Sequence, residues 1–533
     1  MKQLLFFLLF LLNIYLQGYS QPLVINWQKC YGGSQYEYGT SVIKTSSGFF
    51  LLCGTDSQDG DVPGTHGQTD YWLIKIDDSS YHDILWSKTY GGSLDDVNSQ
   101  MKGTYDGGNI LFGITGSNDG DVTGNHGLYD YWVVKVDSSG NIEWSKCLGG
   151  SSVEFADGID IAKDSGYFCQ GYTGSNDGDV TGNHGFYDYW VVKLDRSGNI
   201  RWKKTLGGSD NDLGLCVSST VDRGAIVGGF TYSNDGDVQC MRHGNGDSWV
   251  VKLDSLGQIE WENCYGGSQN DNVNSIISTS DNGYIFTGIT YSNDGDVSGN
   301  HGNGDFWVVK IDHLGNLIWQ KCFGGSELDG PYFIKQSIDG NYFIGGDTYS
   351  KDGDVHGNHS INTSNADMWL IKIDTLGNLL WQQCFGGHMQ ESLRDMDELT
   401  GGNLLLLGGT TTSDNSGDVQ CNHHGPNTSD VWLLSVRDTT FVGIDNQQEK
   451  KNNIIVYPNP ANEFVVFESP IANEINTINI FNSIGENVKN LTLSPIDKQV
   501  KWNVSKQPNG VYYFSAFDSK SKWTSNGKIV IIH

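Results

Sequence analysis

The chain has 533 residues, of which 33 are Lys or Arg and 63 are Asp or Glu, so its formal net charge at pH 7 is −30. A protein this acidic repels nucleic acid and anionic membranes and attracts cations, which excludes nucleic-acid binding. Glycine accounts for 70 residues, about twice its usual share, and it falls at turns instead of a collagen-like period.

Residues 1–20 begin with one lysine near the start, continue with an apolar run and end in small residues. This arrangement predicts a secretory signal peptide with a cleavage site between Ser20 and Gln21. The run is too short to span a bilayer and nothing basic follows it, so we do not interpret it as a membrane anchor. No other long apolar segment is present, and we expect the mature protein to have no transmembrane segment.

From Trp27 to Val436 the sequence repeats itself, and such a period decides the fold. Two tryptophans mark each unit, the first of them two residues after an aspartate. The second recurs at steps of 58 or 59 residues, except for a last step of 62. The first tryptophan stands at Trp72, Trp132, Trp190, Trp249, Trp307, Trp369 and Trp432, and the second at Trp27, Trp86, Trp144, Trp202, Trp261, Trp319 and Trp381.

Each unit has the pattern of four short antiparallel strands. Residues 131–137 (YWVVKVD) and 142–148 (IEWSKCL) are rich in strand-forming residues and are joined by an SSGN turn. Two further strands fill the unit, as at Ser275–Thr279 and Tyr284–Thr290. Four such strands with turns between them are typical of one blade of a β-propeller.

The two ends of the repeat region predict how the ring closes. The Trp27 strand has no partner before it, and the strand Val431–Val436 has no tryptophan strand after it. Pairing them completes a seventh blade and leaves no sheet edge open. We therefore predict an all-β chain: a seven-bladed β-propeller over residues 21–437, followed by a small C-terminal immunoglobulin-like β-sandwich.

The ten cysteines all lie in the repeat region. Five share one repeat position, and equivalent positions on different blades are generally too far apart to bridge. We interpret the cysteines mainly as small buried hydrophobic residues. Two pairs with the same inter-blade relation are candidates for disulfides, Cys30 with Cys53 and Cys147 with Cys169. The five at one position are Cys30, Cys147, Cys264, Cys322 and Cys384.

Beyond a polar linker at residues 438–453 the repeat ends, and residues 454–533 show short alternating strands. The stretch carries Tyr457-Pro458-Asn459-Pro460-Ala461, then INIFNSIGENV, PNGVYY and a terminal KIVIIH. In order and over its whole length it resembles the type A C-terminal sorting domain of the Bacteroidetes type IX secretion system. The resemblance implies binding to that machinery and transport to the cell surface or beyond. The predicted strands are Ile454–Tyr457, Phe464–Ser469, Ile475–Asn482, Val511–Phe517 and Lys528–Ile532.

The repeats themselves, GGSxxD followed by GxTxSxDGDV, are similar to seven-bladed propeller repeats of bacterial surface proteins. Such proteins carry no single activity, so this similarity supports the fold alone.

Propeller geometry places two loops of every unit on one face: the DGDV loop and the loop beginning GGS. We expect this face to gather an acid three residues after each GGS serine and one histidine per unit. The acids are Glu37, Asp96, Glu154, Asp212, Asp271, Asp329 and, in the last unit, Glu391; the histidines are His66, His126, His184, His243, His301, His359 and His423 or His424.

Three interpretations compete for that face. Asp-Gly turns hold loops in shape by bonding to their own backbone, and the aspartates before the tryptophan strands then anchor the turn. Closely spaced carboxylates also suit calcium, although the loops lack the full EF-hand series. A catalytic or transition-metal site is the third, but a histidine repeated in every unit argues for architecture. The anchoring aspartates are Asp70, Asp130, Asp188, Asp247, Asp305, Asp367 and Asp430; the predicted calcium ligands are Asp59, Asp61, Asp119, Asp121, Asp177, Asp179, Asp235, Asp237, Asp294, Asp296, Asp352 and Asp354.

The sequence favours a secreted or cell-surface module that binds a glycan or a protein without catalysis. The alternative is a secreted hydrolase acting on polysaccharide or peptide. Acids are abundant enough on this face to supply a pair of catalytic carboxylates, although their spacing does not identify which two. A structural surface-layer component is a third hypothesis. The sequence names neither the ligand nor a catalytic residue.

Overall fold

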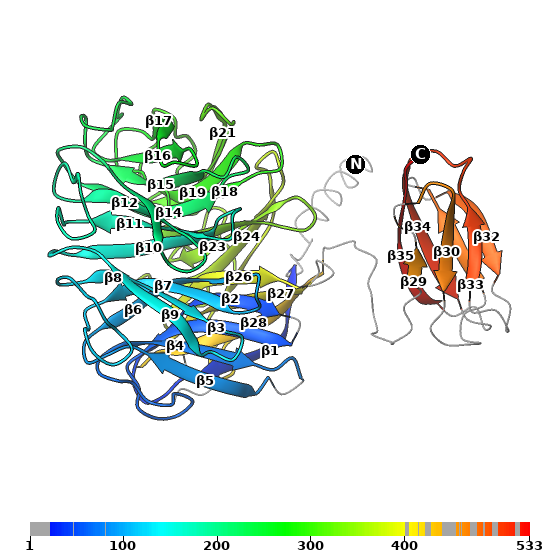
Figure 1. The fold of residues 1–533 in the computed structure, drawn as a ribbon, viewed down its shortest axis with the longest axis horizontal. Coiled ribbons are helices and arrows are strands. Elements are labelled where there is room, and N and C mark those ends of the chain that lie inside the picture. The colour runs from blue at the N-terminus through cyan, green and yellow to red at the C-terminus, as the bar shows by residue number, and fades with distance from the viewer. Residues whose placement is uncertain are drawn as a thin grey trace, which may run out of the picture. The chain divides into compact units, whose positions relative to one another are not determined.

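The computed structural model in Figure 1 divides the chain into two compact units, Met1–Gly443 and Ile444–His533. The predicted signal peptide and nearly all of the predicted linker lie outside the residues that the structure describes. Those residues are 22–45, 47–79, 82–399, 404–413, 415–421, 428–439, 455–457, 459, 461–468, 477–482, 486–492, 499–517 and 523–533.

Within the described residues the first unit consists of strands, turns and loops, without a helix. Its strands are β1 (Leu23–Tyr31), β2 (Glu37–Thr45), β3 (Gly48–Thr55), β4 (Asp70–Ile76), β5 (Ile84–Tyr90), β6 (Asp96–Gly103), β7 (Asn109–Thr115), β8 (Asp130–Val136), β9 (Ile142–Leu148), β10 (Glu154–Ile161), β11 (Tyr167–Thr173), β12 (Asp188–Leu194), β13 (Ile200–Leu206), β14 (Asp212–Ser219), β15 (Ala225–Thr231), β16 (Asp247–Leu253), β17 (Ile259–Tyr265), β18 (Ser275–Ser278), β19 (Tyr284–Thr290), β20 (Asp305–Ile311), β21 (Leu317–Phe323), β22 (Asp329–Gln336), β23 (Tyr342–Thr348), β24 (Asp367–Ile373), β25 (Leu379–Phe385), β26 (Glu391–Glu398), β27 (Leu404–Thr411) and β28 (Asp430–Asp438).

Each repeat forms one four-stranded antiparallel sheet, as predicted, and the described part of this unit holds seven of them. We number the sheets in chain order by their first strand. Sheet 1 is β2-β3-β4-β5, sheet 2 is β6-β7-β8-β9, sheet 3 is β10-β11-β12-β13, sheet 4 is β14-β15-β16-β17, sheet 5 is β18-β19-β20-β21, sheet 6 is β22-β23-β24-β25, and sheet 7 is β26-β27-β28-β1.

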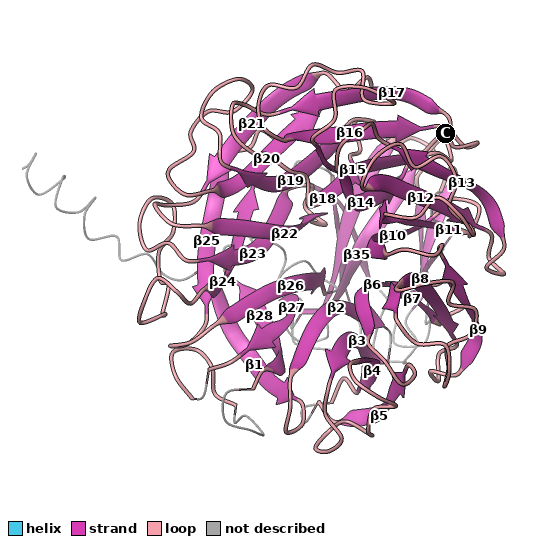
Figure 2. Ribbon diagram, turned by 90° about the vertical axis from the view of Figure 1, so that its left-hand side faces the viewer, coloured by secondary structure: helices cyan, strands magenta, loops and turns pink. Residues whose placement is uncertain are grey.

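The first strand of every sheet is the innermost one. These strands pack beside one another in sequence order, and β26 of sheet 7 packs beside β2 of sheet 1. Figure 2 shows them gathered at the centre with the other strands of each sheet radiating outward. Repeated four-stranded sheets in such an arrangement are consistent with a β-propeller.

The ends of the repeat region close the ring as predicted. β1 pairs antiparallel with β28, from Leu23 opposite Asp438 to Tyr31 opposite Val431. A disulfide between Cys30 and Cys421 joins the same two regions covalently. The N-terminal strand is therefore the outermost strand of the last sheet.

The disulfide candidates from the sequence were wrong. Cys30 pairs with Cys421, and the other disulfide joins Cys240 to Cys264. In both disulfides, one cysteine stands two residues after the Asp-Val pair of a loop, and the other lies on the outermost strand of the same sheet. The bonds therefore form within one sheet and not between neighbouring sheets. The remaining six are buried thiols, as the hydrophobic interpretation expected: Cys53, Cys147, Cys169, Cys216, Cys322 and Cys384.

The core lies between neighbouring sheets. One cluster, for example, joins Ile110 and Phe112 of β7 to Trp190 and Val192 of β12. The first tryptophan of each repeat is completely buried there, whereas the second, on the outermost strand, is only partly buried in most sheets. The third strand of each of sheets 1 to 6 is buried along its whole length, which explains its nearly continuous apolar sequence.

Six innermost strands contain a β-bulge at the same place. In β10 the register shifts between Ala156 and Gly158, which leaves Asp157 as the extra residue. A bulge bends the strand and re-aims the side chain that it adds. The bulged residues are Thr40, Ser99, Asp157, Leu215, Tyr332 and Arg394.

The second unit contains two sheets, β29-β30-β33 and β32-β31-β34-β35, which share one hydrophobic core. The five strands expected from the sequence are present with shifted ends, and two further strands, β32 and β33, were missed. Asn459 of the YPNP motif ties it to the last strand, because its side-chain amide bonds to Lys528 O at 2.9 Å and to Val530 N at 2.8 Å. The strands are β29 (Ile455–Tyr457), β30 (Phe464–Glu468), β31 (Thr477–Phe481), β32 (Asn487–Thr492), β33 (Gln499–Asn503), β34 (Gly510–Phe517) and β35 (Trp523–Ile531).

Candidate functional site

The first aspartate of each intact Asp-Gly-Asp loop bonds to the GGS loop of the same repeat. Asp59 Oδ1 accepts a hydrogen bond from Ser34 N at 2.8 Å. The glycine between the aspartates, Gly60, has a φ of 70°, and a Cβ there would lie 2.4 Å from Gly32 O. The two loops therefore brace each other. The contact recurs at Asp119–Ser93, Asp177–Ser151, Asp235–Ser209, Asp294–Ser268 and Asp352–Ser326.

The second aspartate lies against the same glycines. Asp61 donates its backbone N–H to Gly32 O at 2.9 Å, and Gly32 N donates to Asp61 Oδ2 at 3.3 Å. Both predicted calcium ligands of a loop thus border one Gly-Gly-Ser turn, and calcium binding stays a prediction. Among the described residues, three donor side chains cluster tightly enough for a metal only at Cys240, Glu262 and Cys264, where the two sulfurs form a disulfide.

The acids after the GGS turns do not form an exposed face, which corrects our expectation. All seven are at most 2% exposed and lie beneath the loops. Glu37 accepts hydrogen bonds from Gly33 N at 2.8 Å and Thr55 Oγ1 at 2.7 Å, and Glu391 repeats this with Gly387 N and Thr411 Oγ1, both at 2.7 Å. These carboxylates hold the turn that begins each sheet.

The repeated histidines pair with the aspartates that begin the third strands. His66 Nδ1 lies 2.8 Å from Asp70 Oδ2, and the backbone N of His66 donates to the same oxygen at 2.7 Å. The predicted anchoring role is thereby confirmed in six repeats, while His423 and His424 lie outside the described residues. The other five pairs are His126–Asp130, His184–Asp188, His243–Asp247, His301–Asp305 and His359–Asp367.

Two buried carboxyl groups meet where neighbouring sheets join. A Cβ on Gly91 would lie 2.3 Å from Asp70 Oδ1 and 2.7 Å from Asp96 Oδ2, so the glycine leaves room for both. Burial raises the pKa of Asp96 to about 6, and the charge of Asp70 adds to the shift. We call these acids the junction carboxylates. Burial likewise raises the pKa to about 6 for Asp130, Asp212 and Asp329.

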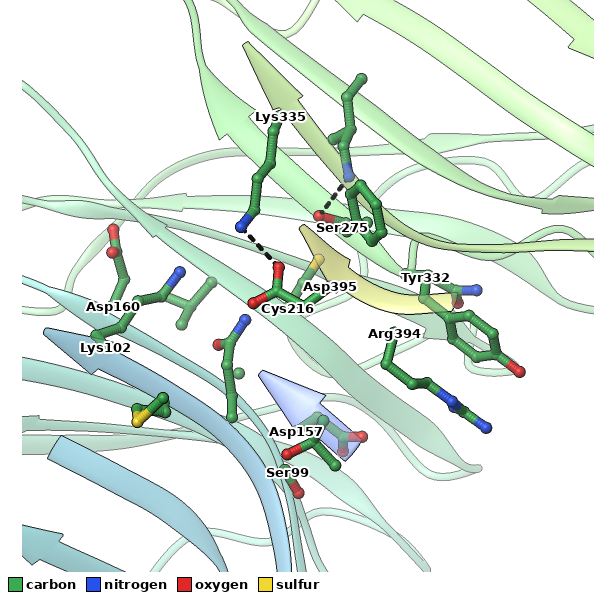
Figure 3. Close-up of a pocket in the computed structure, with 18 of the residues that line it drawn as sticks. Ser99, Lys102, Asp157, Asp160, Cys216, Ser275, Tyr332, Lys335, Arg394 and Asp395 are labelled. Atoms are coloured by element: carbon green, nitrogen blue, oxygen red, sulfur yellow. Dashed lines mark hydrogen bonds and ion pairs between the residues drawn. The ribbon is translucent and has the colours of Figure 1, made fainter. Parts of the chain in front are cut away.

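A central cavity lies where the innermost strands meet. Its volume is about 870 Å³, and all seven innermost-strand segments contribute to its lining. The six bulged residues all line it, and Figure 3 shows several of their side chains around it. Unlike the loops, these positions differ from sheet to sheet.

Sheets 6 and 7 place an arginine with a fixed orientation at this central cavity. The guanidinium of Arg394 lies 3.9 Å from the centroid of the Tyr332 ring. The Tyr332 hydroxyl donates to Asp347 Oδ2 at 3.0 Å, and Asp347 also accepts from Ser392 Oγ and Leu393 N. Burial raises the pKa of Asp347 to about 6, although the charge of Arg394 opposes the shift. Stacking and this network together orient the arginine.

Sheet 3 supplies an unmatched carboxyl to the same cavity. Asp157 Oδ2 is shielded from solvent and has no hydrogen-bond partner among the described residues. Burial raises the pKa of Asp157 well above its ordinary value. Other acids of the cavity are matched: Asp395 pairs with Lys335 at 2.6 Å, and Asp397 Oδ2 accepts from Lys44 N at 2.8 Å.

The sequence analysis missed Arg394, Tyr332, Asp347 and Asp157. A signal was present, because each departs from its repeat: where Asp347 stands, the other repeats have Gly, Ile, Tyr, Phe or Thr. The asymmetry lies in the innermost strands and beside them.

A family model described as a secretion system C-terminal sorting domain matches residues 455–532. This domain marks proteins that the type IX secretion system carries to the cell surface or outside, so the protein is exported by that route. The described residues contain no helix with the length and hydropathy that a membrane crossing requires.

No curated protein matches the sequence. Among solved structures, a fungal alcohol oxidase of the AA5 family in complex with copper is 10% identical, with 96% of this chain and 99% of that chain covered and a TM-score of 0.43. Sqt1 from Chaetomium thermophilum is 12% identical, with 78% and 99% covered and a TM-score of 0.41. An apocarotenoid oxygenase variant from Synechocystis is 10% identical, with 76% and 95% covered and a TM-score of 0.35.

Proposed function

We propose that this exported protein is a non-enzymatic binding module that takes a glycan or protein ligand in its central cavity. In this proposal residues 21–437 form a seven-bladed β-propeller, and residues 438–453 are a linker. Residues 454–533 form an immunoglobulin-like sorting domain that engages the secretion machinery, and residues 1–20 are the signal peptide of a Bacteroidetes protein.

One observation carries the proposal. The repeated acids and histidines hydrogen-bond to the protein itself, whereas the bulged residues of the innermost strands vary and point into a cavity of about 870 Å³. Pockets of this size are typical of ligand sites. Residues repeated in every sheet hold the ring together, and the residues that vary between sheets determine which ligand the cavity binds.

Binding and turnover separate this function from its alternative. The purified full chain is screened on glycan and peptide arrays, and the ligands retained are then incubated with it and analysed by mass spectrometry. The proposal expects retained ligands to stay intact. Cleavage products would contradict the binding module and favour the hydrolase. The absence of any retained ligand would contradict both functions.

The hydrolase alternative has one observation in its favour. A carboxyl group whose pKa is raised by burial, as in Asp157, is what a general acid requires. Asp157→Asn would then abolish turnover while Asp160→Asn, at another lining position of the same strand, would not. A binding module shows no turnover to lose.

The export role of the tail has its own test. Deleting residues 454–533 should leave a folded repeat region inside the cell envelope, because the ring closes through β1 and β28 without the tail. Cell fractionation and blotting would locate the protein. Appearance of the truncated chain at the cell surface would contradict the sorting role.

A further inference from the structure

Arg394 and Asp157 are two groups of the central cavity that have no hydrogen-bond or ion-pair partner among the described residues. The guanidinium of Arg394 stacks on Tyr332, and none of its N–H groups has an acceptor or ion-pair partner among the described residues. Asp157 Oδ2 has none either. Both residues are the extra residue of a β-bulge, so the backbone aims them at the cavity.

The two groups stand on separate parts of the ring and are not paired with each other. Asp157 lies on β10 of sheet 3 and Arg394 on β26 of sheet 7. Figure 3 shows both side chains at the same cavity, with Lys102 and Asp160 toward its other side. Lys102 keeps its partial exposure to solvent, and Asp160 accepts a hydrogen bond from Ser219 N at 2.7 Å.

A guanidinium with free N–H groups matches the planar fork of a carboxylate. An unmatched carboxyl group favours an ammonium, whose charge stabilises the ionised form. A ligand that carries only an anion would be repelled at long range by the net charge of −30 and would leave Asp157 without a partner, and a simple cation would leave Arg394 without one. A net-neutral ligand with both groups avoids both penalties.

We propose that the central cavity binds a short peptide with free termini, with its carboxylate on Arg394 and its ammonium on Asp157. This inference rests on the proposed binding function and names the ligand class. The volume of about 870 Å³ exceeds what one amino acid needs and suits a peptide of a few residues. Tyr332 and Asp347 act as positioning residues for the arginine.

The experiment uses the full chain and random-sequence peptide libraries of two to five residues. Each library is prepared free, N-acetylated and C-terminally amidated, and peptides retained in ultrafiltration are counted by mass spectrometry. We expect retention of the free library to exceed that of either blocked library at least tenfold. Arg394→Gln should abolish discrimination against the amide only, and Asp157→Asn should abolish discrimination against the acetyl group only.

Lys146→Gln is the matched control, because it removes one exposed positive charge on β9, away from the cavity. It should leave all three retentions unchanged, and melting curves should show every variant folded. Equal retention of free and blocked libraries, equal losses in both cavity variants, or no retained peptide would overturn the inference. Retention of glycans without peptides would overturn it while leaving the binding function standing, and peptide fragments would overturn that function as well.

Discussion

Buried charged residues occur both at the junctions between neighbouring sheets and in the central cavity, but they serve different purposes in the two regions. At a junction, Asp70 and Asp96 are buried in the same setting that recurs from sheet to sheet, and backbone amides, hydroxyls and a histidine bond to them. In the cavity, Asp157 and Arg394 each occur in one sheet and lack such partners. Repetition therefore marks the acids that hold the ring, and departure from the repeat marks those left for a ligand.

The sharpest way to test the comparison is one substitution made in both regions. Gly91→Ala places a Cβ 2.3 Å from Asp70 Oδ1, whereas Gly103→Ala, beside the cavity, finds its nearest atom at 3.7 Å. We expect the first to lower the free energy of unfolding by about 3 kcal/mol and the second to change it by less than about 0.5 kcal/mol. Urea unfolding measures both. Equal effects would break the distinction.

The pH dependence of stability tests the junctions alone. The folded-state pKa of four junction carboxylates is raised to about 6: Asp96, Asp130, Asp212 and Asp329. Their contribution to the free energy of unfolding is therefore fully present below the unfolded-state pKa near 4. It is lost as pH rises through about 6. Each group accounts for about 1 to 3 kcal/mol between these limits.

Urea unfolding at pH 5 and pH 8 should therefore show the protein more stable at pH 5. The exposed Asp106 and Asp281, whose pKa values near 2 are lowered through hydrogen bonds and Lys partners, act in the opposite sense only below pH 4. Higher stability at pH 8 would contradict the junction description.

Replacing a buried aspartate by leucine should change the free energy of unfolding in opposite directions in the two regions. Leu215 already occupies the bulge position of Asp157 in sheet 4, so Asp157→Leu removes an unmatched polar group from a site that accepts leucine. We expect about 1 kcal/mol of stabilisation, measured by thermal or urea unfolding. Asp96→Leu leaves Gly92 N and Ser117 Oγ without their acceptor and should destabilise. Destabilisation by both would mean that Asp157 is structural.

Calcium should give the smallest effect per site, at the loops above the junctions. One carboxylate oxygen of each first aspartate already accepts an amide, which leaves fewer ligands for an ion. At a calcium concentration equal to Kd, each loop gains about 0.4 kcal/mol. Melting curves in chelator, calcium and magnesium at matched ionic strength should shift upward in calcium. Three identical curves would leave the loops as turns.

The sequence alone predicted most of the fold but little of the site. The period, the alternating strands and the unpaired ends at Trp27 and Val431 specify sheets and closure, because strand pairing follows from pattern and topology. The burial of Glu37 could not be predicted, since an acid after a turn is usually exposed and only the stacked loops enclose it. The bulge that aims Arg394 depends on register, which one strand's sequence does not determine.

The closure through Cys30 and Cys421 has a consequence for life outside the cell. An exported protein meets proteases, which cut exposed loops first. A cut near the N-terminus would ordinarily free β1, but here the strand stays attached through its sulfur and its pairing with β28. A nick between sheets leaves both fragments in one ring, so cleavage of the chain and loss of the cavity become separate events.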